Sequence, residues 1–168
     1  MNCGVQKNMN QISIRKAVAA DASIITKFIR FMLEEMESMD GHQIIDKDSE
    51  WETVENELKK RIDDKDCIIL FAEINAPPLE HIGFVEAQIF NFGFVFKPKK
   101  TLHIRSVYVS PSHRRKGIAM KLLKAVLEWG KKVGCIEADL NILVSNPAYA
   151  LYEKLGFKKF EIKMLKKL

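Results

Sequence analysis

The sequence has few cysteines, no long apolar run and no common glycine-rich nucleotide-binding motif. Cys3, Cys67 and Cys135 are far apart and lack metal-ligand spacing, so we expect a cytoplasmic location, no disulfide framework and no metal site. No apolar run approaches the roughly 18 residues needed to cross a bilayer, and the N-terminus lacks an apolar signal core. Neither GxxxxGK[ST] nor GxGxxG occurs, which excludes a Walker-type loop and the dinucleotide-binding fingerprint.

The chain has 168 residues, of which 47% are hydrophobic and 29% charged, as in an ordinary globular protein. This length predicts one domain over residues 1–168, in which residues 1–11 form a flexible lead. The net charge of +5 is unevenly distributed, because residues 34–66 hold 13 acidic and 5 basic side chains. One acidic and one basic region indicate two unlike ligands, one cationic and one anionic, or simply two solvated faces and a lysine-rich tail.

Apolar periodicity and turn residues predict strands that alternate with helices. The order indicates a mixed α/β (α+β) domain with a central sheet and helices on both faces. The expected strands cover residues 12–15, 67–74, 82–92, 101–109, 136–144 and 157–165, and the expected helices begin near Asp21 and Ser49 and cover residues 117–133 and 148–155.

The stretch from Leu102 to Trp129 predicts a strand, a basic turn and a long amphipathic helix. Backbone N–H groups and the helix dipole converge at such a junction, which favours a bound phosphate or pyrophosphate. Gly117 and Ala119 have little side-chain bulk, so a ligand can approach the backbone closely. The alternative is a solvent-exposed basic turn that needs its glycine for geometry.

Two motifs resemble those of the GNAT superfamily of N-acetyltransferases. The run from Val107 to Ala119 is similar to the pattern Gln/Arg-x-x-Gly-x-Gly/Ala, which Arg114, Gly117 and Ala119 meet. The run from Ser145 to Phe157, SNPAYALYEKLGF, resembles Asn-x-x-Ala-x-x-Leu-Tyr-Glu-Lys-x-Gly-Phe, with Ser145 in place of the first Asn. The resemblance implies a splayed, mostly antiparallel sheet of six to seven strands with about four helices.

The resemblance also implies acetyl-coenzyme A as co-substrate. Backbone amides of residues 115–119 would bind its pyrophosphate, and Val109 would pair with the pantetheine arm near the thioester carbonyl. Ser145 would either contact the cofactor or cap the short helix that follows it. The cofactor-binding residues implied in this way are Val107, Val109, Arg114, Arg115, Lys116, Gly117, Ile118, Ala119, Ser145, Asn146 and Tyr152.

An amine that attacks a thioester needs an oxyanion donor, an acid and a base. The resemblance assigns the acid to Tyr152, whose phenol would protonate the departing thiolate. Some related enzymes have a Glu on the strand before the turn, but this region reads His103-Ile104-Arg105-Ser106. Glu86 is therefore the first candidate for the base and His103 the second. Period-two alternation places His103, Arg105, Val107 and Val109 on one face.

The acidic region lies where the resemblance places the acceptor. Glu34, Glu35, Glu37 and Asp40 would favour a cationic acceptor, such as a small-molecule amine or a basic peptide, attacking directly in a ternary complex. An alternative is a non-catalytic sensor or interaction module that binds acetyl-coenzyme A. We expect no nucleic acid as partner, because the basic residues are not interleaved with aromatic ones. Residues 160–168 are a candidate edge for a homodimer.

Overall fold

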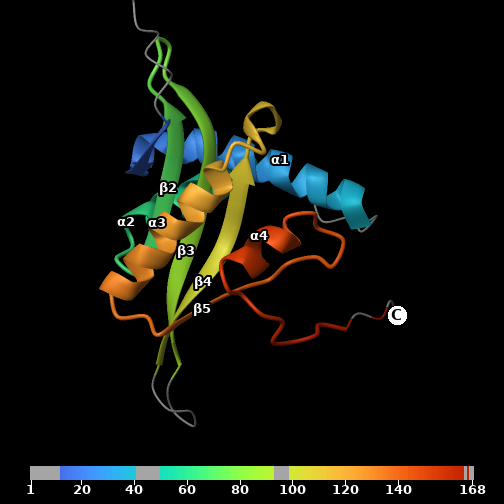
Figure 1. The fold of residues 1–168 in the computed structure, drawn as a ribbon. Helices are drawn as coiled ribbons and strands as arrows, with labels where there is room; N and C mark the ends of the chain where they lie inside the picture. The colour runs from blue at the N-terminus through green and yellow to red at the C-terminus, as the bar shows by residue number, and fades with distance from the viewer. Residues whose placement is uncertain (1–11, 41–49, 93–98, 165, 167–168) are drawn as a thin grey trace, which may run out of the picture.

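The computed structural model describes residues 12–40, 50–92, 99–164 and 166 (Figure 1), so the expected lead at 1–11 lies outside them. Five strands form one sheet in the order β1-β2-β3-β4-β5. The strands β1 to β4 pair with one another in antiparallel order, whereas β5 is parallel to β4. The strands are β1 (Ile12–Lys16), β2 (Cys67–Ile74), β3 (Glu80–Phe92), β4 (Lys99–Val109) and β5 (Glu137–Leu140).

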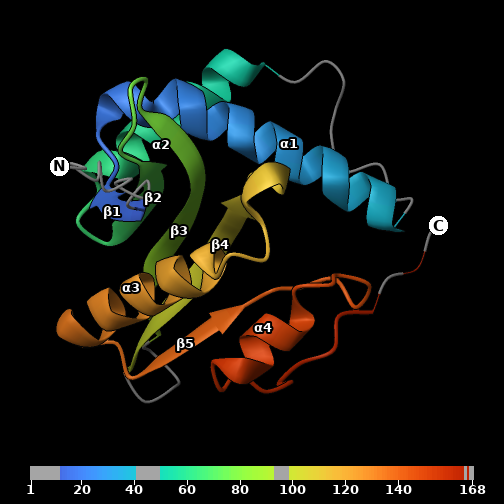
Figure 2. The same cartoon turned by 45° about the horizontal axis from the view of Figure 1, so that its top comes forward.

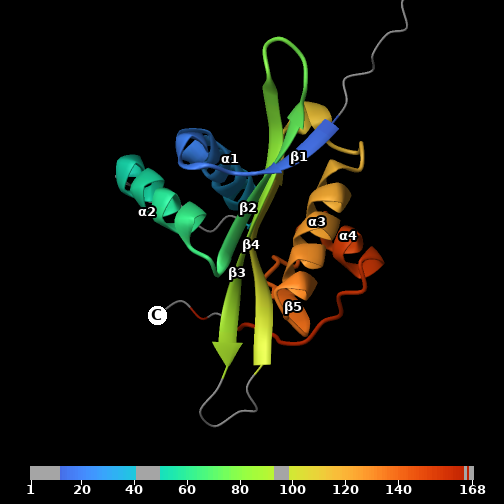
Figure 3. The same ribbon diagram turned by 90° about the vertical axis from the view of Figure 1, so that its left-hand side faces the viewer.

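Helices lie on both sides of this sheet, as the sequence predicts (Figure 3). The helices α1 (Ala22–Asp40) and α2 (Trp51–Asp63) cover one face, and α3 (Ile118–Lys132) and α4 (Tyr149–Lys154) lie on the other. Short 3-10 turns, η1 (Ala19–Asp21) and η2 (Pro111–His113), precede α1 and follow β4. Each face has its own core: Phe28, Leu58 and Phe71 pack below α1 and α2, and Leu70, Leu122 and Val126 pack below α3. No helix among the described residues is long and apolar enough to cross a membrane.

The C-terminal segment differs from the prediction. Residues 157–164 form neither helix nor strand, so the described sheet has five strands rather than six or seven. Phe160, Ile162 and Met164 alternate with charged residues but are 92%, 90% and 91% exposed. Alternation produces a strand only where a neighbouring strand accepts its hydrogen bonds, and none of the described strands does so here. A dimer edge in this segment stays a prediction.

A β-bulge in β4 changes which side chains share a face. Glu86 of β3 is opposite Ser106, and Ala87 is opposite Ile104, so Arg105 has no partner in the ladder. One extra residue reverses the inward and outward alternation. His103 and Arg105 therefore face α1 and α2, whereas Val107 and Val109 pack in the α3 core. The expectation that all four share one face is wrong.

Gly83 permits β3 and β4 to approach closely at the end of β4. A Cβ atom at this position would lie 2.5 Å from the carbonyl oxygen of Tyr108 and 3.2 Å from the Cα of Val109. We expect Gly83→Ala to lower the free energy of unfolding, measured by urea denaturation, by about 1–3 kcal/mol through overpacking against backbone.

Gly130→Ala is the matched control for Gly83→Ala. Its Cβ would meet the end of the Leu102 side chain, at 2.7 Å, and this side chain can move. Alanine also gains about 1 kcal/mol over glycine within a helix. Equal losses of stability in the two variants would contradict the prediction that contact with the backbone of β4 makes Gly83→Ala the more destabilising change.

Candidate functional site

The free edge of β4 carries backbone groups that point away from β3. Ser110 donates its N–H to the carbonyl of Ile82, at 2.9 Å, and the preceding Val109 is opposite Gly83. Hydrogen-bonded and non-hydrogen-bonded pairs alternate along an antiparallel ladder, so the N–H and C=O of Val109 and Val107 point outward. β5 pairs only with residues 101–104, and no described strand covers the edge beyond Ile104. Figure 2 shows β4 and β5 diverging from this point.

The turn between β4 and α3 contains two residues in left-handed conformation. Arg115 has a φ of 62° and Gly117 a φ of 76°. Gly117 is the N-cap of α3, without a side-chain cap or an acidic residue in the first turn. The first N–H groups of the helix thus have no partner within it. Because no atom lies within 4 Å of a Cβ built on Gly117, a ligand has room to approach, which fits an anion such as pyrophosphate.

The side chain of Arg114 joins this turn to α1. Its Nε donates to the carbonyl of Val109 at 2.9 Å, and one terminal nitrogen donates to both carboxylate oxygens of Glu35, at 2.6 and 2.7 Å. The guanidinium carbon lies 5.7 Å from the centre of the Tyr108 ring. The Arg114 side chain therefore connects the turn to α1. Lys116 bonds to the carbonyl of Ser112 at 3.1 Å, and the Ile118 side chain is buried in the core.

Neutralising Glu35 tests whether the contact between Arg114 and Glu35 positions the turn. We expect Glu35→Gln to weaken binding of coenzyme A, measured by calorimetry, about threefold to tenfold, since a partly exposed ion pair contributes about 1 kcal/mol. Glu34→Gln is the control, because Glu34 pairs with Arg30 on the exposed side of the same helix, at 3.1 Å. A similar loss in both variants would show that the charge of α1, and not the contact between Arg114 and Glu35, affects the binding of coenzyme A.

The second motif places Asn146 in a structural role. Its Oδ1 accepts the N–H of Ala148 at 2.9 Å, and its carbonyl accepts the N–H of Tyr149 at 3.1 Å. Ser145 is exposed, and α4 begins only at Tyr149, after an N-cap without a side-chain bond. The expectation that Ser145 caps this helix is therefore wrong, and Asn146 stabilises the turn before it.

Tyr152 lies on α4, half-buried beside the α3 core. Its ring meets Phe157 edge to face, with 6.0 Å between centres. Burial raises the pKa of its phenol above the ordinary value of 10.0, so the group keeps its proton at neutral pH. This protonation state is the one that a general acid requires.

The two candidate bases, Glu86 and His103, lie on the face covered by α1 and α2. Glu86 is 1% exposed, with Oε1 at 2.9 Å from Nε of Arg61 and 3.5 Å from Nε of Arg105. Burial raises the pKa of its carboxyl, against the opposing effect of the two guanidinium groups. His103 is half-buried, and its Nδ1 lies 2.6 Å from Oδ1 of Asp139 on β5.

The acidic side chains of α1 are largely paired within the chain. Glu34 contacts Arg30, Glu35 contacts Arg114, and Glu37 is half-buried on the same helix. The side chain of Asp40 lies outside the described part of the structure. Local pairing therefore offsets part of the negative charge that the sequence predicts for an acceptor site.

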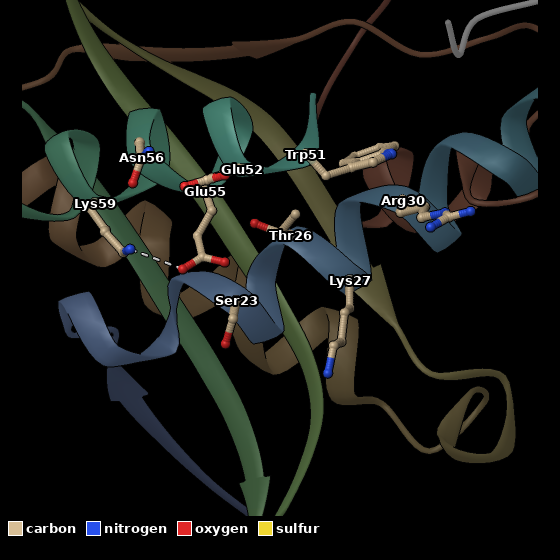
Figure 4. A pocket seen from close by; sticks show the side chains of 9 residues that line it. All are labelled: Ser23, Thr26, Lys27, Arg30, Trp51, Glu52, Glu55, Asn56 and Lys59. Atoms are coloured by element: carbon tan, nitrogen blue, oxygen red, sulfur yellow. Dashed lines mark ion pairs between the residues drawn. The ribbon is translucent and has the colours of Figure 1, made fainter. Parts of the chain in front are cut away.

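An open groove of about 500 Å³ runs between the outer faces of α1 and α2 (Figure 4). Its lining includes an ion pair from Glu55 to Lys59 at 3.0 Å and Arg30 over the ring of Trp51 at 5.7 Å. The faces of these helices that carry Phe28 and Leu58 pack on the sheet, so the groove lies on the opposite side, away from β4. The lining residues are Ser23, Thr26, Lys27, Arg30, Trp51, Glu52, Glu55, Asn56 and Lys59.

The model of the acetyltransferase (GNAT) family matches residues 31–157, which include the whole junction and both motifs. The chain belongs to the GNAT family. The GNAT fold is also found in solved structures: an aminoglycoside N-acetyltransferase in complex with CoA aligns with a TM-score of 0.74 and 19% identity over 98% of this chain and 99% of that chain. A predicted acetyltransferase from Clostridium acetobutylicum, with acetyl-CoA, aligns with a TM-score of 0.75 and 18% identity over 94% and 96%.

Curated GNAT relatives match over shorter stretches. An N-alpha-acetyltransferase of Saccharolobus solfataricus is 48% identical over 62 residues, which are 36% of this chain and 37% of that protein. An aminoglycoside N(6')-acetyltransferase type 1 of Acinetobacter genomosp. 13 is 37% identical over 59 residues, 34% of this chain and 40% of that protein. The chain thus spans two fifths or less of the length of these two relatives.

Sequence reasoning missed Asp139 and the contact between Arg114 and Glu35. A signal for Asp139 is present, because Glu137 and Asp139 alternate on a strand that follows a long helix and so lies parallel to β4. The contact of Arg114 with Glu35 joins residues 79 positions apart. No local pattern in the sequence could have indicated it.

Proposed function

We propose that this GNAT chain transfers an acetyl group from acetyl-coenzyme A to a primary amine of a small, cationic acceptor, by direct attack in a ternary complex. The observation that carries the proposal is the continuous path from the free edge of β4, through the left-handed turn, to the uncapped N-terminus of α3. An extended amide chain with a pyrophosphate at one end matches this path in shape and in hydrogen-bonding groups.

The binding roles follow from this path. The outward N–H and C=O groups of Val107 would pair with the pantetheine amides, next to the N–H of Val109; the C=O of Val109 already accepts Nε of Arg114. The backbone of residues 115–119, with the cationic side chains of Arg115 and Lys116 nearby, would hold the pyrophosphate. Ser145 and Asn146, before α4, remain proposed contacts of the cofactor.

The co-substrate supplies an activated acetyl group as a thioester. The outward N–H of Val109 would stabilise the negative charge that develops on the thioester oxygen. Tyr152, whose phenol stays protonated, would donate its proton to the sulfur as the carbon–sulfur bond breaks. The cationic acceptor would approach from the side of α1, where Glu34, Glu35 and Glu37 lie.

Two further parts of the proposal rest on separate observations. Aminoglycoside N(6')-acetyltransferases among the relatives support a small polyamine-like acceptor. Free thiols at the buried Cys67 and half-buried Cys135 support a cytoplasmic, reducing location.

A panel of amines tests the proposal. Free thiol released from acetyl-coenzyme A would be measured for polyamines, aminoglycosides and basic peptides, with glutamate as an acceptor of opposite charge. We expect release with at least one cationic amine and none with glutamate. Tight binding of acetyl-coenzyme A without release for any amine would favour the alternative, a non-catalytic sensor or interaction module.

A further inference from the structure

We infer that the chain forms a homodimer in which residues 157–164 of each copy add a strand to the open edge of β5 in the other copy. The inference goes beyond the proposed acetyl transfer and does not depend on it, because it concerns a surface outside the junction of β4 and α3. Its basis is a pair of features in one chain, an unpaired segment with the pattern of a strand and an unpaired strand edge.

The segment after α4 has the pattern of a strand but leaves its large apolar side chains uncovered. From Phe160 to Met164, apolar and charged side chains alternate. Phe160, Ile162 and Met164 are each at least 90% exposed, and Figure 1 shows the segment as a coil beyond α4. In an extended conformation these three side chains share one face. They would form an apolar surface that a partner can cover.

The outer edge of β5 can accept an additional strand. β5 is the last strand of the sheet, and none of the strands in the described part of the chain lies beyond it. Ile136 donates its N–H to the carbonyl of Lys100, at 3.0 Å. Backbone groups alternate in direction along a strand, so the N–H and C=O of Glu137 and Asp139 point outward. An open edge of this kind is a template for pairing with another chain.

The exposed apolar side chains of the protein are concentrated in the C-terminal part of the chain. Nine large apolar side chains are exposed among the described residues, and five of them lie within residues 136–164. Two of these five come directly before β5 and shortly after it, and the other three belong to the C-terminal segment. Exposed apolar surface of this extent favours an interface. The five residues are Ile136, Val144, Phe160, Ile162 and Met164.

A second copy of this chain is the partner that satisfies both features. Each copy supplies one unpaired segment and one open edge, so an exchange about a two-fold axis fills both edges at once. A different protein that bound one feature would leave the other unpaired. The charges are also complementary, because β5 carries Glu137 and Asp139, with side chains 46% and 58% exposed, whereas residues 157–164 hold three lysines and one glutamate.

The area of such an interface is that of a stable dimer. A Phe, Ile or Met side chain buries on the order of 100–150 Å² when it is fully covered. The partner surface that covers each side chain loses about as much accessible area. Exchange of two segments with three such side chains each would therefore bury roughly 1,200–1,800 Å², whereas stable interfaces bury about 1,200–2,000 Å².

Sedimentation equilibrium of the full chain tests the inference. We expect a mass of twice the 19.3 kDa of one copy. The double variant Phe160→Lys, Ile162→Lys should raise the dissociation constant about thirtyfold or more, because two charges would enter the apolar part of the interface. Both side chains are exposed within one copy, so the variant should fold and keep the circular dichroism spectrum of the unmodified chain.

The double variant Val18→Lys, Leu79→Lys is the matched control. It adds the same charge at two apolar positions that are 56% and 49% exposed and lie outside residues 136–164. This variant should keep the dissociation constant of the unmodified chain. Equal weakening in the two double variants would show that net charge governs association, and an unchanged dimer in the first would place the interface elsewhere. Either result would overturn the inference.

Hydrogen exchange distinguishes the edge of a second copy from the edge of the same chain. The amides of residues 158–164 should be protected where the dimer forms, and this protection should be lost on dilution below the dissociation constant. Protection that dilution leaves unchanged would show pairing with β5 of the same chain and would contradict the exchange. A dimeric mass without protection, or a monomeric chain, would also contradict it. None of these measurements depends on thiol release, so the proposed acetyl transfer is tested separately.

Discussion

Tyr152→Phe should lower kcat for acetyl transfer about a hundredfold or more, because loss of a general acid costs 10²–10⁴ in rate. The substitution removes one oxygen and keeps the ring that packs against Phe157. Affinity for acetyl-coenzyme A and the thermal stability should therefore stay the same. Thiol release under saturating substrates measures kcat, and calorimetry with coenzyme A measures binding.

Tyr149→Phe is the control on the same helix. Tyr149 is also half-buried, and Nζ of Lys159 lies 5.4 Å from its ring, but it does not occupy the position of the general acid. This variant should keep kcat within twofold. Equal losses in both variants would indicate that α4 itself is perturbed and would contradict the role of Tyr152.

The pH dependence follows from the raised pKa of the Tyr152 phenol. A general acid acts only while it holds its proton, and burial moves the loss of this proton to a pH above 10. Deprotonation of Tyr152 should therefore not reduce kcat between pH 7 and pH 9. A fall in that range that is absent from Tyr152→Phe would contradict the role of burial.

Gly117→Ala should weaken binding of coenzyme A about tenfold to a hundredfold. The new methyl group occupies the open space in front of the N-terminus of α3, where the pyrophosphate would lie. Displacing the phosphate from one backbone N–H costs about 1.5–3 kcal/mol, the free energy of a hydrogen bond to a charged group. Calorimetric titration with coenzyme A, and with pantetheine as a ligand that lacks the pyrophosphate, measures this loss.

Gly134→Ala controls for backbone strain in this experiment. Gly134 follows the other end of α3, has a φ of 88°, and likewise has no atom within 4 Å of a built Cβ. Both variants should lose about 1–2 kcal/mol of stability, because alanine is strained in the left-handed region. Only Gly117→Ala should lose affinity for coenzyme A, and neither should change affinity for pantetheine.

Local patterns in the sequence predicted the junction well. The strand, the basic turn and the helix over residues 102–129 are confirmed, because apolar periodicity and a glycine at the helix start act over a few residues. The order of the helices and the first five strands is confirmed for the same reason. The motifs also marked Asn146, although its contact with Ala148 depends on a turn whose geometry the sequence does not show.

Features that depend on two distant segments were not predicted. The bulge at Arg105 exists only in the register of β4 against β3, and a period-two pattern in β4 alone gives no sign of it. Phe160 and Ile162 have the alternation of a strand, but a strand also needs a partner edge. The pairs of Arg114 with Glu35 and of His103 with Asp139 likewise form only once the fold is complete.

The unpartnered Arg105 has a consequence for how such a chain can diversify. It divides β4 into a first half, in which His103 and Arg105 face α1 and α2, and a second half, in which Val107 and Val109 face the α3 core. Under the proposed function, a substitution at Thr101 would change only the side of β4 from which the acceptor is expected to approach, and Val107 and Val109 would stay unchanged. A one-residue deletion at Arg105 would instead reverse the faces of one half of β4. The proposed acceptor side and the proposed co-substrate side of the strand could then no longer change independently.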